Sequence, residues 1–202
     1  MFRLFLVRHG ETDWNVAKRY LGQTDLSLNV TGRKQVEHLA QELREINFLR
    51  CYTSDLIRAQ QTALTILQDH STDIIIEPAL REASFGNWEG LTYAEVCNQY
   101  PLEVTSWIDS EGLIAPGGGE SLEDLKERLT NWLEDLYAED PEGSILVVTH
   151  GGPLRLLLCL LMGLPITKHW KFSVEPSSMA VLEVYDGEAI LQIHQAISTA
   201  PA

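Results

Sequence analysis

Short continuous runs of apolar residues alternate along the chain with segments in which apolar residues recur at helical spacing. Phe2–Val7 runs into Arg8-His9-Gly10, and Ile145–Thr149 runs into His150-Gly151-Gly152. Unbroken apolar runs of this length predict strands that are buried on both faces of a sheet. Two further strands are predicted at Phe48–Tyr52 and Ile74–Ile76.

Four segments between these runs predict helices. One pattern opens at Thr31-Gly32, and a second starts at Thr53-Ser54-Asp55. A third follows Ser121, which with Asp124 resembles a capping box in which Asp stands in place of Glu. The apolar run Pro153–Met162 predicts the fourth helix. Pro116 to Gly119 is predicted to be a loop.

Strands that alternate with helices predict an α/β fold, a three-layer α/β/α sandwich with a mainly parallel sheet. Val181–Tyr185 and Ala189–Ile193 flank Asp186-Gly187, which predicts a hairpin and therefore an antiparallel edge. We expect residues 1–202 to form a single domain, in which residues 85–120 form a small cap over the site.

The composition fits a folded chain with an acidic surface. The 202 residues are 45% hydrophobic and 22% charged, and a chain of this length buries roughly 70% of its unfolded surface. Lys and Arg number 15 against 29 Asp and Glu, a net charge of −14. Such a charge argues against nucleic acid and anionic membranes as partners, and at first sight against a phosphorylated substrate.

The charge is unevenly distributed. Residues 103–142 hold 12 acidic and 2 basic side chains, whereas residues 1–58 hold 9 basic and 7 acidic ones. Salt screens exposed charges beyond about 8–10 Å. A positive phosphate site can therefore exist inside this acidic protein.

The ends and the cysteines predict a cytoplasmic protein. The N-terminus lacks the pattern of a signal peptide, and the run Leu156–Leu164 is far shorter than the roughly 20 residues of a membrane span. Three cysteines without CxxC spacing predict no disulfide framework. No histidine pair has metal-ligand spacing, so we predict no metal and no cofactor.

Polar side chains follow the predicted strands at one edge of the sheet. His9 and His150 each follow a strand and precede a glycine, and Arg58 lies near the start of a helix after another strand. Ligands of open α/β sheets bind beyond the carboxyl ends of the strands. Guanidinium groups, here those of Arg8 and Arg58, match the oxygens of a phosphoryl group.

Six blocks of sequence together resemble the histidine phosphatase superfamily, whose phosphoglycerate-mutase-like branch carries an Arg-His-Gly tripeptide. The resemblance extends from position 3 to about 165. The blocks are Leu6–Asn15, Gly22–Leu28, Thr53–Ala59, Leu80–Gly90, Pro116–Ser121 and Val148–Gly152.

The resemblance implies a role for each matching residue. His9 would be the nucleophile that forms a phosphohistidine. Arg8, Arg58 and His150 would bind the phosphoryl oxygens, and Glu82 would be the general acid and then the base for water. Three further residues would bind substrate: Asn15, Gln23 and Gly151, the last through its backbone.

Elementary chemistry is consistent with these roles and leaves some open. A histidine attacks only when it is neutral, and neighbouring arginines disfavour its protonated form. An ester leaving group needs a proton at neutral pH. Asn15 fits a helix cap equally well, and Thr24 fits a turn.

The leading hypothesis is a metal-independent hydrolase of a small phosphorylated metabolite. The short chain lacks the insertion that mutases carry after the acid, and it resembles α-ribazole-5′-phosphate and broad-specificity phosphatases. A metal-independent phosphoserine phosphatase is an alternative. Those enzymes typically end in a short motif that contains His-Leu, whereas this chain has Ala196-Ile197-Ser198-Thr199. A cofactor-dependent phosphoglycerate mutase and a non-catalytic sensor are further alternatives. A homodimer through the edge of the C-terminal hairpin is also predicted.

Overall fold

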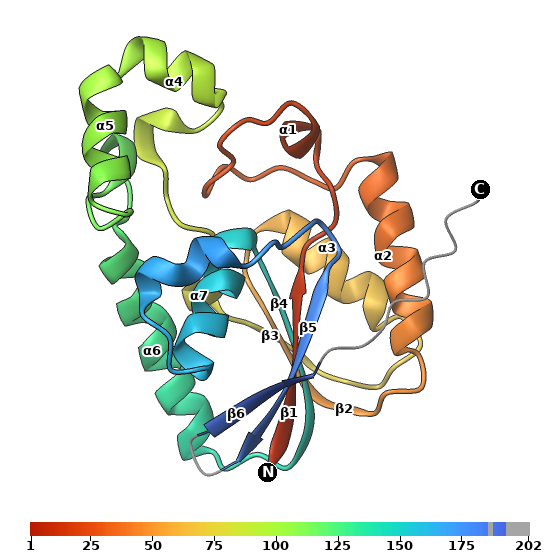
Figure 1. The fold of residues 1–202 in the computed structure, drawn as a ribbon. Coiled ribbons are helices and arrows are strands. Elements are labelled where there is room, and N and C mark those ends of the chain that lie inside the picture. The colour runs from red at the N-terminus through yellow and green to blue at the C-terminus, as the bar shows by residue number, and fades with distance from the viewer. Residues whose placement is uncertain (186–187, 193–202) are drawn as a thin grey trace, which may run out of the picture.

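The apolar runs form the strands of one six-stranded sheet in a computed structural model that describes residues 1–185 and 188–192 (Figure 1). The strands are β1 (Phe2–Arg8), β2 (Phe48–Thr53), β3 (Ile74–Ile76), β4 (Gly143–Thr149), β5 (Met179–Tyr185) and β6 (Glu188–Gln192). Their order is β3-β2-β4-β1-β5-β6. The first four are mutually parallel, and β5 and β6 are antiparallel to their neighbours. The predicted mixed sheet is confirmed.

The predicted hairpin is also confirmed, because β5 pairs with β6 from Tyr185 opposite Glu188 to Val181 opposite Gln192. Its predicted turn, Asp186-Gly187, and the strand end Ile193 lie outside the described residues.

Four long helices cover the two faces of the sheet, and three shorter helices lie near its carboxyl edge (Figure 1). The long ones are α2 (Val30–Leu43), α3 (Ile57–Ile66), α6 (Leu122–Ala138) and α7 (Gly151–Leu161). The others are α1 (Asp13–Val16), α4 (Tyr93–Gln99) and α5 (Pro101–Asp109). The capping box of Ser121 and Asp124 is present as predicted.

Helix α3 begins later than predicted, at Ile57 and not at Thr53-Ser54-Asp55. Thr53 continues β2, pairing with Val148 and Ile76. The Asp55 carboxylate binds the Arg81 guanidinium, at 2.5 and 2.7 Å. Thr53 therefore extends the strand, and Asp55 holds the segment that contains Arg81, so neither residue starts the helix.

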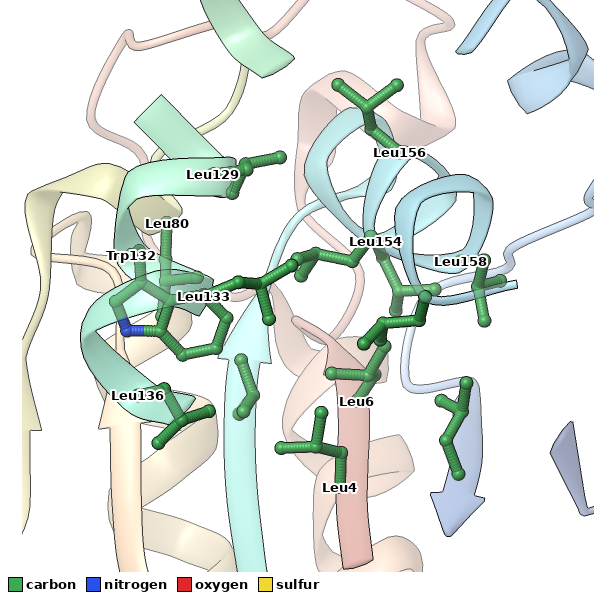
Figure 2. Close-up of a cluster of buried hydrophobic side chains, with 14 of the residues drawn as sticks. Leu4, Leu6, Leu80, Leu129, Trp132, Leu133, Leu136, Leu154, Leu156 and Leu158 are labelled. Carbon is green, nitrogen blue, oxygen red and sulfur yellow. The ribbon is translucent and has the colours of Figure 1, made fainter. Parts of the chain in front are cut away.

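Each strand in the middle of the sheet contributes side chains to two hydrophobic clusters, one on each face. Leu4 and Leu6 pack against α6 and α7 in the cluster that Figure 2 shows, whereas Phe5 and Val7 pack against α2 and α3. Burial on both faces explains why Leu4–Val7 of β1 is an unbroken apolar run.

The segment from residue 85 to 120 lies beyond the carboxyl ends of the parallel strands (Figure 1). It contains α4, α5 and two 3-10 turns, Gly86–Trp88 and Pro116–Gly118, the second where a loop was predicted. Trp88, Val96 and Val104 form a small core of its own. Among the described residues, no helix is long and apolar enough to cross a membrane.

Candidate active site

The register of two parallel strands places the two histidines side by side. Arg8 of β1 pairs with Thr149 of β4, so the next residue on each strand is His9 or His150. The His9 amide donates to the carbonyl oxygen of Thr149 (3.0 Å), and the imidazole centroids are 5.0 Å apart. Both side chains are buried.

The ring of His9 is held in one tautomer. Its Nδ1–H donates to the carbonyl oxygen of Gly10 (2.7 Å), which can only accept. Burial, together with the charges of Arg58 and Arg8, keeps the pKa of His9 well below its usual value. The imidazole is therefore neutral at physiological pH, and its lone pair lies on Nε2.

Arg58 is fully buried at the start of α3 and anchored through all three of its nitrogens. Its Nη1 and Nη2 donate to the carbonyl oxygens of Thr24 (2.8 Å) and Gly22 (2.7 Å). Burial lowers the pKa of Arg58 to about 10, so it is still a cation at neutral pH. A guanidinium has five N–H groups, so among the residues that the structure describes one N–H on each Nη has no partner and is left for a ligand.

His150 links Arg58 to Ser54. Its Nδ1 accepts from Nε–H of Arg58 (3.2 Å), and its Nε2–H donates to the Ser54 hydroxyl oxygen (2.8 Å). Burial and the Arg58 charge keep the pKa of His150 well below its usual value. In this arrangement His150 orients Arg58. Direct donation by His150 to a phosphoryl group would require a proton on Nδ1 and release of Arg58.

Arg8 brings a second cation to the end of β1. Its Nη1 donates to the carbonyl oxygen of Val174 (2.6 Å), while its buried Nε has no hydrogen-bond partner among the described residues. Burial lowers the pKa of Arg8, an effect that Glu82 opposes and Arg155 increases. A buried donor without a partner costs about 1–3 kcal/mol, so an oxygen-rich anion here would stabilise the site.

Glu82 lies at the N-terminus of α7. Its carboxylate accepts from the Gly152 amide (3.1 and 3.2 Å) and from the Ala83 amide (2.9 Å). The segment before it is fixed to β4, because the Thr149 hydroxyl donates to the carbonyl oxygen of Leu80 (2.7 Å). A Cβ atom on Gly152 would lie 2.4 Å from the carboxylate, so glycine is needed for this contact.

The three predicted substrate-binding residues have different surroundings. The side-chain amide of Gln23 donates through Nε2 to the backbone carbonyl of Glu82 and to the Glu120 carboxylate, both at 3.2 Å, which places it beside Glu82. Asn15 closes the capping box of α1, its amide oxygen accepting from Thr12. Gly151 is the first residue of α7, so its amide has no partner within the helix.

Three residues that were given no role from the sequence contact this site. Ser54 holds His150, Glu89 binds the Gly22–Thr24 loop, and Arg155 lies beside Arg8. Ser54 and Glu89 were within the blocks that carried the family resemblance, so the signal was present. Arg155, on the apolar helix α7, carried no signal beyond being one charge among leucines.

A pocket opens beside Glu82. It encloses about 610 Å³, a volume that includes its opening to solvent. Its lining includes Phe85 and Trp107 from the segment 85–120, together with Arg155 and Trp170 from the other side.

Comparison with known proteins gives consistent matches over nearly the whole chain. The family model described as the Histidine phosphatase superfamily (branch 1) matches residues 4–196. Phosphoserine phosphatase 1 of Hydrogenobacter thermophilus is 32% identical over 191 residues, 95% of this chain and 90% of the relative. The adenosylcobalamin/alpha-ribazole phosphatase of Escherichia coli is 30% identical over 95% of this chain and 94% of the relative. The crystal structure of a putative alpha-ribazole-5′-P phosphatase from Escherichia coli superposes with a TM-score of 0.90 at 30% identity, covering 95% of both chains.

Proposed function

Since this chain belongs to the histidine phosphatase superfamily and is a phosphoric monoester hydrolase, we propose that it acts through a phosphohistidine at His9, without a metal. The observation that carries this proposal is the neutral His9 ring, which donates through Nδ1 to Gly10 and lies next to Arg8, whose Nε has no partner in the described part of the chain. A nucleophile and a cationic oxygen-binding group thus lie at the same strand end.

In the first step, the lone pair on Nε2 of His9 attacks phosphorus while the ester P–O bond breaks. Arg8 and the two free N–H groups of Arg58 hold the phosphoryl oxygens, and His150 keeps Arg58 oriented. Glu82 gives its carboxyl proton to the leaving oxygen, and an alcohol departs.

In the second step, water attacks the phosphorus of the phosphohistidine. The Glu82 carboxylate takes a proton from that water as the N–P bond breaks. Inorganic phosphate leaves, and the electron pair returns to Nε2 of His9. Asn15 and the Gly151 amide are the additional donors to the phosphoryl group, and Gln23 lies on the side of the leaving group.

The substrate is a small phosphorylated metabolite. The relatives include enzymes named for α-ribazole and for phosphoserine, and we favour α-ribazole 5′-phosphate or a broad range of esters over phosphoserine. The mutase alternative predicts conversion of 3-phosphoglycerate to 2-phosphoglycerate without net phosphate release.

We further infer a cytoplasmic protein, supported by three free cysteines, and a homodimer through β6, the last described strand of the sheet. Sedimentation of the purified protein tests the dimer.

Trapping the intermediate tests the mechanism. Protein is mixed with a phosphomonoester labelled with ³²P, in the presence of EDTA, and quenched in alkali, in which phosphohistidine persists. We expect label on the wild type and none on His9→Ala, with steady phosphate release by the wild type alone. Turnover by His9→Ala, or turnover that stops when EDTA is added, would contradict the proposal.

A further inference from the structure

An ion pair between Arg128 of α6 and Glu120 lies beside the segment that carries Glu82. The guanidinium donates to both carboxylate oxygens of Glu120, through Nε at 2.8 Å and through Nη2 at 3.1 Å. Only 20% of the Arg128 side chain and 22% of the Glu120 side chain are exposed. Two parallel hydrogen bonds and partial burial fix the pair in one geometry, unlike an exposed ion pair, whose side chains remain free to move.

Arg128 also binds the backbone that leads to Glu82. Its Nη1 donates to the carbonyl oxygen of Ala79, and its Nη2 donates to the carbonyl oxygen of Glu82 (3.1 Å). A single side chain on α6 thus holds both ends of the stretch 79–82. Lysine has one nitrogen and could not make these contacts and the two bonds to Glu120 together.

Glu120 binds the chain on the other side of Glu82. Its carboxylate accepts from the backbone N–H of Ser84 (2.9 Å), and its own backbone N–H donates to the Ser84 carbonyl oxygen (2.8 Å). The side-chain amide of Gln23 donates both to this carboxylate and to the Glu82 carbonyl oxygen, at 3.2 Å each. The ion pair therefore fixes the backbone before and after Glu82.

The Glu82 carboxylate has no side-chain partner among the described residues. Its hydrogen bonds come from the backbone N–H groups of Ala83 and Gly152. The Ala83 N–H moves together with Glu82, so it cannot place the carboxylate relative to the rest of the site. The position of this carboxylate therefore depends on the Gly152 N–H and on the backbone that carries Glu82.

The ion pair holds this backbone without adding net charge. A cation without a counter-ion favours the ionised form of a neighbouring carboxyl group, whereas an acid catalyst must carry a proton when the reaction starts. The Glu120 carboxylate offsets the charge of Arg128. A guanidinium offers five donors in one plane, so the pair combines several backbone contacts with zero net charge.

We propose that Arg128, with Glu120 as its counter-ion, is the positioning residue for the acid Glu82. The pair fixes the backbone of residues 79–84 and so keeps the Glu82 carboxyl group at the N-terminus of α7. Arg128 acts through Glu82 and transfers no proton itself. This inference rests on the proposed function, in which Glu82 is the acid, but the placement of Glu82 can be measured without turnover.

Two phosphate esters test the proposal, because ethyl phosphate needs a proton on its leaving oxygen and 4-nitrophenyl phosphate does not. We expect Arg128→Gln to lower kcat for ethyl phosphate by about 10- to 10²-fold, and kcat for 4-nitrophenyl phosphate by less than about 3-fold. Arg128→Lys should lie between Arg128→Gln and the wild type, and it replaces Arg128→Gln if that variant does not fold. The control Arg50→Gln breaks the ion pair with Glu139 at the other end of α6 and should change neither kcat.

A double-mutant cycle shows whether Arg128 acts through Glu82. When Glu82→Gln is already present, adding Arg128→Gln should change kcat for ethyl phosphate by less than about 3-fold, because both substitutions remove the same contribution. Effects that multiply in the double variant would overturn the proposal. An equal loss of kcat for both esters in Arg128→Gln would also overturn it.

Hydrogen exchange of the Gly152 N–H, followed by NMR, reads the position of Glu82 directly. Gly152 is the second residue of α7, so its N–H has no acceptor within the helix and is protected by the Glu82 carboxylate. We expect exchange at least about 10-fold faster in Arg128→Gln and unchanged in Arg50→Gln. Unchanged exchange in Arg128→Gln would overturn the proposal. If Glu82→Gln alone affects both esters equally, the acid of the proposed function is wrong, and the exchange of Gly152 still decides whether Arg128 places Glu82.

Discussion

The carboxylate of Glu89 accepts two hydrogen bonds from Thr24, one from its amide (2.8 Å) and one from its hydroxyl (2.5 Å). The backbone N–H of Gln23 donates to the same carboxylate (3.0 Å). Glu89 follows the turn Gly86–Trp88, so a residue of the segment 85–120 fixes a loop near the N-terminus. That loop supplies the two carbonyl oxygens that orient Arg58. Glu89 is therefore a positioning residue for Arg58.

Glu89→Gln should lower kcat by about 10²-fold, because a shift of about 1 Å in a catalytic group has an effect of this size. The variant's amide nitrogen cannot accept the bonds that the loop donates. We expect the loss in kcat, with a smaller change in KM and a melting temperature close to that of the wild type.

The matched control is Glu95→Gln. Glu95 accepts the same pair of bonds from Thr92, at 2.7 and 3.0 Å, but it caps α4. An equal fall of kcat in both variants would show that Glu89 only stabilises the segment 85–120 and does not position Arg58.

Arg58→Lys should lose most activity although it keeps the positive charge. Lysine has one nitrogen and cannot reach Gly22, Thr24 and His150 together. We expect kcat/KM to fall by about 10²- to 10³-fold and vanadate to inhibit more weakly. Arg33→Lys, on α2, is the control. Near-normal kinetics for Arg58→Lys would show that charge alone suffices.

The sheet, and the closeness of His9 to His150 at its edge, could be predicted from the sequence for one physical reason. Two strands that end in His-Gly and lie parallel in neighbouring positions bring those histidines together, and the Arg8–Thr149 register does so here. Short apolar runs mark the two central strands, Leu4–Val7 in β1 and Ile145–Val148 in β4, because a strand buried on both faces excludes polar residues.

The rest depends on contacts between distant segments, which no local pattern encodes. The hydrogen bonds that Glu89 accepts from Thr24, 65 positions earlier, do not follow from the spacing of residues in the sequence. The closeness of Arg155 to Arg8 does not follow from it either. The late start of α3 has the same origin, since Arg81 holds Asp55 from 26 positions away. The capping box of Thr92 and Glu95 was a readable local signal for α4 that the periodicity did not reveal.

Gly152→Ala should displace the acid without unfolding the chain. The new Cβ would lie 2.4 Å from the Glu82 carboxylate, which is the end of a flexible side chain and can move. Alanine is also favourable inside α7. We expect kcat for an alkyl phosphate to fall by about 10²- to 10⁴-fold, and kcat for 4-nitrophenyl phosphate, whose leaving group needs no proton, to fall far less.

Glu82→Gln is the comparison for that experiment, and it should show the same dependence on the leaving group. If Gly152→Ala lowers kcat equally for the alkyl phosphate and for 4-nitrophenyl phosphate, the substitution acts on phosphate binding and not on the acid.

His9 and His150, the two buried histidines of the site, should make the protein less stable as the pH falls below about 6.5. In the unfolded chain they gain protons near that pH, whereas in the folded chain burial and the arginines keep the pKa values of His9 and His150 well below it. The unfolded state thus binds more protons, so the free energy of unfolding decreases as the pH drops from 6.5 toward the folded-state pKa values. The slope approaches about 1.4 kcal/mol per pH unit for each histidine.

Urea unfolding between pH 5.0 and 7.5 measures this slope. The amide nitrogen of His9→Asn can still donate to Gly10. This variant should lower the slope by nearly the contribution of one histidine, and the double variant with His150→Asn should lower it by nearly that of two. Leu102→Ala, at an exposed position on α5, should leave the slope as it is. A wild-type slope that the His9 and His150 substitutions do not change would show that neither ring is held neutral by the fold, which would also remove the basis for His9 as the nucleophile.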